Sequence, residues 1–99
     1  MTSDLLLRIL MVYSVNYDLN NPGQNYEKVK AAVEALGPSI RVLKSTFLVS
    51  CPLSASVVWD KISWAFDTND RAFISQVTSN HAGWLGTDLW NWLSPKVAA

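Results

Sequence analysis

The sequence predicts a single α+β domain in which strands and helices follow the order β-α-β-β-α-β. The chain has 99 residues, which is the usual length of one domain. Stretches rich in β-branched and aromatic residues, which are typical of strands, are interleaved with stretches whose apolar residues recur at helical spacing. Turn-forming clusters of Asn, Asp, Gly and Pro separate these stretches at 20–25, 37–39 and 67–70.

The first strand is predicted within 9–19, where the side chains alternate from Met11 onward. One face carries Met11, Tyr13, Val15 and Tyr17, and the other carries Val12, Ser14, Asn16 and Asp18. The first face is apolar, and the second becomes polar toward the C-terminal end of the strand. A period of two with one apolar face is typical of a half-buried strand.

An amphipathic helix of about three turns is predicted next, because apolar residues recur at helical spacing between Tyr26 and Leu36. Asn25 is expected to cap its first turn, and Gly37 followed by Pro38 is expected to end it. The β-branched and aromatic stretch 40–51 is long for one strand. It predicts two short strands with a bend near 44–45.

A second helix is predicted from its cap at Ser54 to Phe66. Its expected buried stripe consists of Val58, Ile62 and Ala65. Another strand is predicted at 71–78, and the segment 84–93 is expected to include a short helix around 88–93.

These elements predict a ferredoxin-like sandwich over 1–99, with a Trp-rich C-terminal tail at 79–99. Each helix connects two strands that can lie parallel, and right-handed crossovers then place both helices on one face of the sheet. The other face mixes polar residues such as Ser14 with aliphatic residues such as Val12. A face of this kind is often completed by a second copy of the chain, so a homodimer is expected.

Charge and composition exclude several classes of function. Lys and Arg number 8 and Asp and Glu number 8, a balance that excludes a histone-like electrostatic binder, because phosphate affinity scales with clustered basic residues. Cys51 is the single cysteine, which excludes an intramolecular disulfide and favours the cytoplasm. The apolar run at 5–15 is interrupted by Arg8 and is shorter than the ~20 residues that span a bilayer, so no membrane partner is expected.

Several motifs resemble the small CRISPR-associated adaptation nucleases. The motifs are NYDL at the end of the first strand, RVLKSTFLVS in the middle of the chain and DTNDRAFISQV before the last strand. The resemblance implies a ferredoxin-like homodimer in which Asp18, Ser45 with Phe47, and Asp70 occupy the family's positions. A closer resemblance is to a SinR-like branch of short bacterial proteins, which share YDLN, PGQNY, KST-x-LV and an AGW…WNWL-like ending.

Asp18 is the candidate catalytic residue and the candidate metal ligand. If two copies of Asp18 meet in a dimer, their carboxylates could hold one Mg²⁺, which polarises a phosphodiester or activates a water. Magnesium is the only cofactor that the sequence suggests. Ser45 could orient Asp18 or contact phosphate, as its family position implies. The alternatives are a turn role for Asp18, with its carboxylate accepting backbone N–H groups, and a hairpin hydroxyl for Ser45 that satisfies the local backbone.

Other polar residues are weaker candidates for catalysis. Asp67 and Asp70 could add an acidic cluster for metal, although an acidic turn before a strand is more often solvated and could cap the preceding loop. His81 is the only histidine, and it lies in a small polar loop with no nucleophile at a motif spacing. The chain contains no Ser-His-Asp, HExxH, P-loop or dinucleotide-binding motif, which excludes conventional hydrolases, kinases and dehydrogenases.

Two groups of residues are candidates for binding. The candidate nucleic-acid-binding residues are Arg41, Lys44 and Arg71, which could contact phosphates while nearby aromatic residues stack on bases. Scattered cations on a neutral chain more often form ordinary solvated faces. The candidate dimer-interface residues are Trp84, Trp90 and Trp92. They are predicted to form an apolar flap over the sheet edge or across the dimer, with nucleic-acid stacking as the alternative.

The sequence thus leaves two functions open. One is a non-catalytic homodimeric module that binds protein or nucleic acid, and the other is a Mg²⁺-dependent endonuclease of RNA or DNA that uses Asp18 from both subunits. The nuclease family usually follows its strand-ending Asp with a charged, often Arg-rich loop, whereas here the loop is LNNPGQN, without a base or second acid. This difference favours the module.

Overall fold

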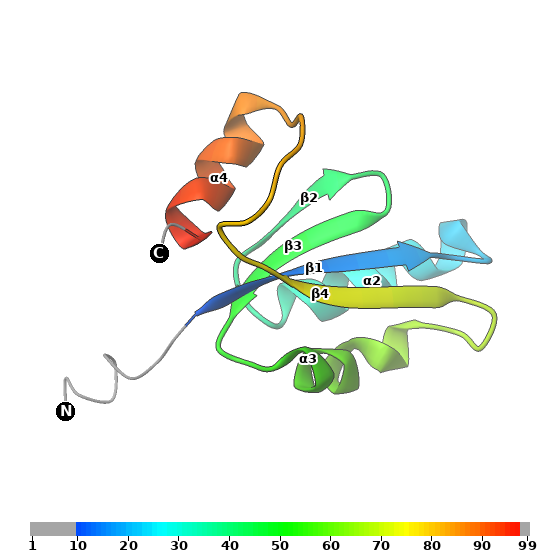
Figure 1. The fold of residues 1–99 in the computed structure, drawn as a ribbon. Helices are drawn as coiled ribbons and strands as arrows, with labels where there is room; N and C mark the ends of the chain where they lie inside the picture. The colour runs from blue at the N-terminus through cyan, green and yellow to red at the C-terminus, as the bar shows by residue number, and fades with distance from the viewer. Residues whose placement is uncertain (1–9, 98–99) are drawn as a thin grey trace.

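The computed structural model describes residues 10–97, without the side chains of Pro22 and Gln24, as one four-stranded antiparallel sheet with helices on both faces (Figure 1). The elements in chain order are β1 (Met11–Asp18), α2 (Pro22–Glu34), β2 (Ser39–Leu43), β3 (Thr46–Cys51), α3 (Ala55–Ile62), the short 3-10 helix η1 (Ser63–Ala65), β4 (Arg71–Val77) and α4 (Thr87–Val97). The predicted α+β class and the order of the first six predicted elements are confirmed.

The strands lie in the order β2-β3-β1-β4, and every neighbouring pair is antiparallel. Strand β1 is central and pairs with both β3 and β4. Helix α2 connects β1 to β2 and helix α3 leads from β3 toward β4, so each helix joins two strands that are separated by a third. The predicted bend near 44–45 is confirmed as the turn between β2 and β3.

The inner face of the sheet, defined as the face covered by α2 and α3, carries the larger part of the core. Tyr13, Val15 and Tyr17 of β1 are all buried there, which confirms the predicted alternation of this strand. The helices contribute Val29, Ala32, Val33, Val58, Ile62 and Ala65 to the same cluster. The predicted buried stripe of the second helix is therefore confirmed.

Helix α2 begins earlier than the sequence predicted. Its first residue is Pro22, so Asn25 lies inside the first turn and is not the cap. A proline at the first helical position loses nothing, because the N–H that it lacks has no partner inside the helix. The side chain of Asn25 is buried and donates hydrogen bonds to Asp67 at 2.8 Å and to Asp70 at 3.2 Å.

The predicted N-terminal cap of the second helix is confirmed, whereas the predicted single helix to Phe66 is divided into α3 and η1. The Ser54 hydroxyl accepts a hydrogen bond from the Val57 backbone N–H at 3.3 Å, as expected of an N-cap. After α2, a Cβ atom on Gly37 would collide with the Ser50 carbonyl oxygen. The predicted helix stop at Gly37 thus also reflects the close approach of this segment to β3.

The outer face of the sheet, opposite α2 and α3, is partly covered by α4. Leu93 of α4 is buried against Val12 and Leu48, with Trp90 and Trp92 packed at the margin of this cluster. The tail therefore forms a helix on the face of the sheet, longer than the predicted 88–93, and not a flap over its edge. The aliphatic residues at this end of the outer face explain the placement, because Leu93 buries apolar surface there. Among residues 10–97, no helix is long and apolar enough to cross a membrane.

Candidate functional site: a pocket at the hairpin and an open part of the outer face

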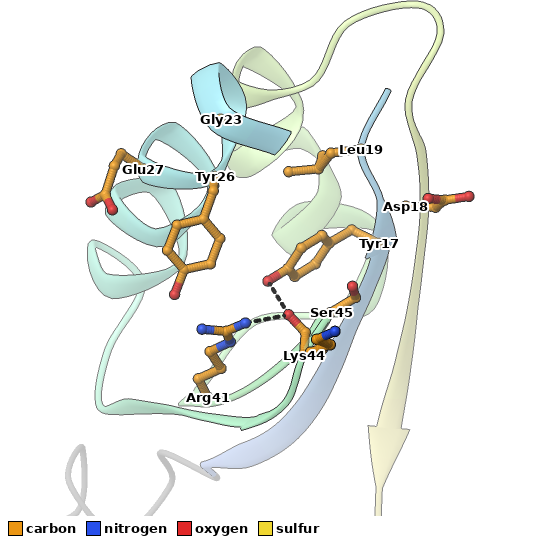
Figure 2. Close-up of a pocket in the computed structure, with 9 residues that line it drawn as sticks. All are labelled: Tyr17, Asp18, Leu19, Gly23, Tyr26, Glu27, Arg41, Lys44 and Ser45. Atoms are coloured by element: carbon orange, nitrogen blue, oxygen red, sulfur yellow. Dashed lines mark hydrogen bonds between the residues drawn. The ribbon is translucent and has the colours of Figure 1, made fainter. Parts of the chain in front are cut away.

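A pocket of about 570 Å³ lies at the end of the sheet where β1 runs into the loop before α2 and where β2 turns into β3 (Figure 2). It is lined by Tyr17, Asp18, Leu19, Gly23, Tyr26, Glu27, Arg41, Lys44 and Ser45. The fold thus brings together four residues that the sequence singled out separately, namely Asp18, Arg41, Lys44 and Ser45.

Three aromatic rings from three elements support this pocket. The ring centroids of Tyr17 and Phe47 are 6.0 Å apart, and those of Tyr26 and Phe47 are 6.1 Å apart, both in stacked arrangements. Burial raises the pKa of the Tyr17 hydroxyl, as does Tyr26, while the positive charge of Arg41 lowers it. Tyr17 is therefore a neutral hydrogen-bond donor at physiological pH.

Arg41 is held in a defined position at the pocket. Its Nη2 atom donates to the Lys44 carbonyl oxygen at 2.8 Å, and the Tyr17 hydroxyl donates to the same oxygen at 3.4 Å (Figure 2). The guanidinium carbon lies 5.0 Å from the centroid of the Tyr26 ring, which is a cation–π distance. The β2 register, in which Arg41 pairs with Phe47, places this side chain on the inner side of the sheet.

Asp18 lies at the rim of the pocket, but its side chain points away from the other lining residues (Figure 2). It is exposed, and the alternation of β1 places it on the outer face, where its register partner on β4 is Arg71. Within residues 10–97, no hydrogen bond or ion pair holds its carboxylate. The turn role considered for Asp18 is performed by Asp70.

Asp70 is a structural residue that holds three segments together. Its carboxylate accepts hydrogen bonds from the Asp67 and Asn20 backbone N–H groups, each at 2.8 Å, and from the Asn25 side chain. The bond from Asp67, together with those from Asn20 and Asn25, holds the pKa of Asp70 below its ordinary value although burial opposes this shift. Asp70 is not solvated, since its exposed fraction is 7%, but it does cap the preceding turn by accepting the Asp67 N–H.

The described residues contain no group of three or more His, Cys, Asp or Glu side chains that could hold a metal ion. Asp70 is engaged by its hydrogen bonds, whereas Asp18 lies on the outer face. A Mg²⁺ ion at Asp18 would need further protein ligands or water from outside this chain. Ser45 is exposed in the hairpin turn, and its carbonyl oxygen accepts the Tyr17 N–H at 3.1 Å.

The third candidate cation for nucleic acid, Arg71, lies apart from the pocket. Its guanidinium donates to the carbonyl oxygens of Asp70 at 2.9 Å and Thr68 at 3.4 Å. Strand alternation places it on the outer face with Phe73, while Arg41 and Lys44 line the pocket. The three predicted binding cations therefore do not form one patch within a single chain.

The three predicted interface tryptophans also separate. Trp84 is 98% exposed, whereas Trp90 and Trp92 are half-buried against their own sheet. The Trp90 ring stacks on His81 at a centroid distance of 5.9 Å, and His81 Nδ1 lies 2.6 Å from the Thr78 carbonyl oxygen. His81 thus contacts the tail, and no nucleophile is hydrogen-bonded to it among the described residues.

A part of the outer face remains uncovered by α4. It carries Phe73, which is 69% exposed. A groove of about 320 Å³ lies between this face of the sheet and the segment 81–85. Polar residues Ser14, Asn16, Thr46 and Ser75 form the floor of this open part. This part of the sheet is the open outer face.

Tyr26 and Glu27 are pocket residues that the sequence did not single out. A usable signal existed, since Tyr17 and Tyr26 flank the turn NNPGQN and the loop brings its two ends together. Comparison of the sequence with protein-family models finds no match, and comparison with curated proteins finds none either. Inferences about the function of this chain therefore rest on the geometry described above.

Proposed function

We propose that this chain is a non-catalytic module that acts as a homodimer and binds protein or nucleic acid. The observation that carries the proposal is the solitary position of Asp18 on an outer face that also exposes large apolar side chains. The strand order β2-β3-β1-β4, with α2 and α3 on one face, supports a ferredoxin-like fold of the kind found in the CRISPR-associated adaptation nucleases and their SinR-like relatives. The free, buried Cys51 is compatible with a reducing cytoplasm.

The geometry around Asp18 argues against catalysis by a single chain. Metal-assisted cleavage needs a carboxylate set that positions the ion and the attacking water. The described residues supply one exposed carboxylate at this position, and the nearest register partner is the cation Arg71. In the part of the chain that the structure describes, no group of acidic side chains gathers at Asp18 to help it orient a metal ion.

The open outer face supports dimerisation through a second copy of the chain. Phe73 is 69% exposed, Leu43 is 57% exposed and Trp84 is 98% exposed, so considerable apolar area is left to bury. The formal net charge is zero, and two copies do not repel each other through net charge. Asp18 and Arg71 stand side by side in register, so a two-fold axis can pair Asp18 of each copy with Arg71 of the other.

One observation favours the alternative, a Mg²⁺-dependent endonuclease that uses Asp18 from both subunits. The Asp18 carboxylate is exposed and makes no hydrogen bond or ion pair within residues 10–97, so it is available to a metal. In that arrangement the two-fold axis would bring Asp18 next to Asp18, and the metal would offset the repulsion between the two carboxylates.

Two measurements on the full chain test the proposal. Sedimentation should show a dimer, and labelled single- and double-stranded RNA and DNA should remain intact with Mg²⁺ or Mn²⁺ as they do with EDTA. The same assays on Asp18→Ala, after its folding is checked by circular dichroism, provide the matched control. Metal-dependent cleavage by the wild type that is lost in Asp18→Ala would establish the nuclease, and a monomer at every concentration would exclude the homodimer.

A further inference from the structure

We propose that the pocket between the β1–α2 loop and the β2–β3 turn binds a nucleotide, with its phosphate on Arg41 and Lys44 and its base against the apolar wall. The shared chemistry is a nucleoside monophosphate, either free or at the end of a strand. The inference rests on the proposed binding function, since it names a ligand for the module. It does not depend on the dimer, because every lining residue belongs to one chain.

The phosphate position follows from how Arg41 is held. One of its nitrogens is used by the Lys44 carbonyl oxygen, and its position over the Tyr26 ring fixes the plane of the guanidinium. Its other N–H groups remain as donors in a fixed arrangement, which suits the bidentate binding of a phosphate. Because these two contacts already hold the exposed side chain in this position, less conformational entropy is lost when the ligand binds.

Two neighbouring groups add to this donor set. Lys44 is exposed beside the pocket and supplies a second positive charge. The Tyr26 hydroxyl makes no hydrogen bond to any other described residue, and in Figure 2 it lies close to the Arg41 guanidinium. A phosphate oxygen placed there would accept from both residues.

The negative charges of the pocket lie away from this position. Asp18 points to the outer face, and Glu27 lies on the other side of the Tyr26 ring from Arg41 (Figure 2). A phosphate is therefore favoured at Arg41 and disfavoured near Glu27. The Glu27 carboxylate can instead accept hydrogen bonds from the N–H groups of a base or from ribose hydroxyls.

The pocket has room for more than a phosphate. Its volume of about 570 Å³ falls in the range of sites for small organic ligands. Leu19, Gly23 and the two tyrosines offer an apolar wall, and the polar residues Asp18, Glu27 and Ser45 complete the lining. A ligand that combines a phosphate with a flat, weakly polar body matches both parts, and nucleotides have this composition.

The test is titration of the full chain with AMP, GMP, CMP and UMP, followed by calorimetry and by amide chemical shifts. We expect binding with shifts concentrated at 17–27 and 41–45, and no binding of the unphosphorylated nucleosides. Arg41→Gln should weaken binding at least about tenfold, because it removes charge-assisted hydrogen bonds. Tyr26→Phe keeps the ring and removes only the hydroxyl, so a loss of a few-fold is expected.

The control is Lys61→Gln, which removes one positive charge from an exposed position on α3 outside the pocket. It should bind as the wild type does. Absence of nucleotide binding by the wild type would overturn the inference, as would undiminished binding by Arg41→Gln. Tighter binding of phosphotyrosine than of any nucleotide would also overturn it, and would indicate a phosphopeptide.

Two further comparisons distinguish a free nucleotide from the end of a strand, and the nucleotide site from the proposed homodimer. If a 5′-phosphorylated oligonucleotide binds more tightly than AMP and its 5′-hydroxyl counterpart does not, the ligand is a strand end. Equal affinity for the oligonucleotide and AMP indicates a free nucleotide. A monomer that still binds AMP would remove the homodimer and keep the pocket, whereas a dimer that ignores nucleotides would do the reverse. Release of base or phosphate from the bound ligand would contradict the non-catalytic function but not the nucleotide site.

Discussion

At the scale of single residues, Asp70 does most to fix the end of the sheet on which the pocket depends. Its carboxylate joins the loop after β1, the first turn of α2 and the turn before β4 through hydrogen bonds from Asn20, Asn25 and Asp67. The same loop carries Leu19 and Gly23, which line the pocket. Loss of Asp70 should therefore affect both stability and the shape of the pocket.

We predict that Asp70→Ala lowers the free energy of unfolding by about 2–3 kcal/mol, because three donors, one of them on the buried Asn25, lose a charged acceptor. Urea denaturation followed by circular dichroism measures this difference. Asp60→Ala is the matched control, since Asp60 is an exposed residue of α3, and it should change stability by no more than about 0.5 kcal/mol. Equal stability of the two variants would show that the hydrogen bonds of Asp70 contribute nothing.

The pKa of Asp70 predicts a dependence of stability on pH. The folded pKa lies below the ordinary value of 3.8, so the folded state stabilises the ionised carboxylate. This contribution is fully present above the unfolded pKa and is lost as pH falls through the folded pKa. Denaturation measured from about pH 5 down to about pH 2 should show a steeper loss for the wild type than for Asp70→Asn. Parallel curves would contradict the prediction.

At the scale of elements, helix α4 decides how much of the outer face is available. Leu93 is its buried contact with β1 and β3, while Trp90 and Trp92 lie at the margin. Leu93 is the one fully buried residue of α4 among the described residues, so this element should open more easily than the central strands.

If α4 opens only with the whole domain, we predict that Leu93→Ala lowers the free energy of unfolding by about 2–5 kcal/mol, because the substitution leaves a cavity. If α4 opens by itself, the same change should raise hydrogen exchange at 87–97 while the amides of β1 keep their protection. Hydrogen exchange measured by mass spectrometry separates the two cases. Ser94→Ala, at an exposed position of the same helix, is the control and should leave exchange unchanged.

The sequence was most informative where the signal is local. The alternation of β1 and the Ser54 cap each depend on residues a few positions apart, and both were predicted correctly. The start of α2 was not, because Pro22 and Gly23 have the composition of a turn although proline also suits the first position of a helix.

The candidate site was less accessible from sequence because its parts come from distant segments. Asp70 bonds to groups 45 and 50 positions away, and no local pattern indicates such partners. The pocket likewise joins the segment 17–27 to the segment 41–45. The apolar character of the tail was predicted correctly. Its position on the outer face depends on which part of the sheet the other helices leave uncovered, and the spacing of apolar residues in the tail does not contain that information.

At the scale of the whole molecule, the proposed dimer sets Asp18 against Arg71 of the partner. We predict that Asp18→Arg and Arg71→Asp each weaken the dimer by about 0.5–1 kcal/mol and that the double variant regains part of this loss. Sedimentation equilibrium measures the dimer dissociation constants, and denaturation at low protein concentration controls for changes within one chain. A stronger dimer in Asp18→Asn would instead indicate that Asp18 faces Asp18.

The polar residues of the open outer face have a consequence for any partner. Thr46 donates to Asn16, the Asn16 amide donates to Ser14 and to the Phe73 carbonyl oxygen, and the Ser14 and Ser75 hydroxyls lie 2.9 Å apart. This ladder crosses β3, β1 and β4, and its side-chain donors have acceptors within the sheet. Polar groups that already have partners lose few hydrogen bonds when water is removed. The free-energy cost of removing water from this surface is correspondingly small, although the side chains of the ladder are polar.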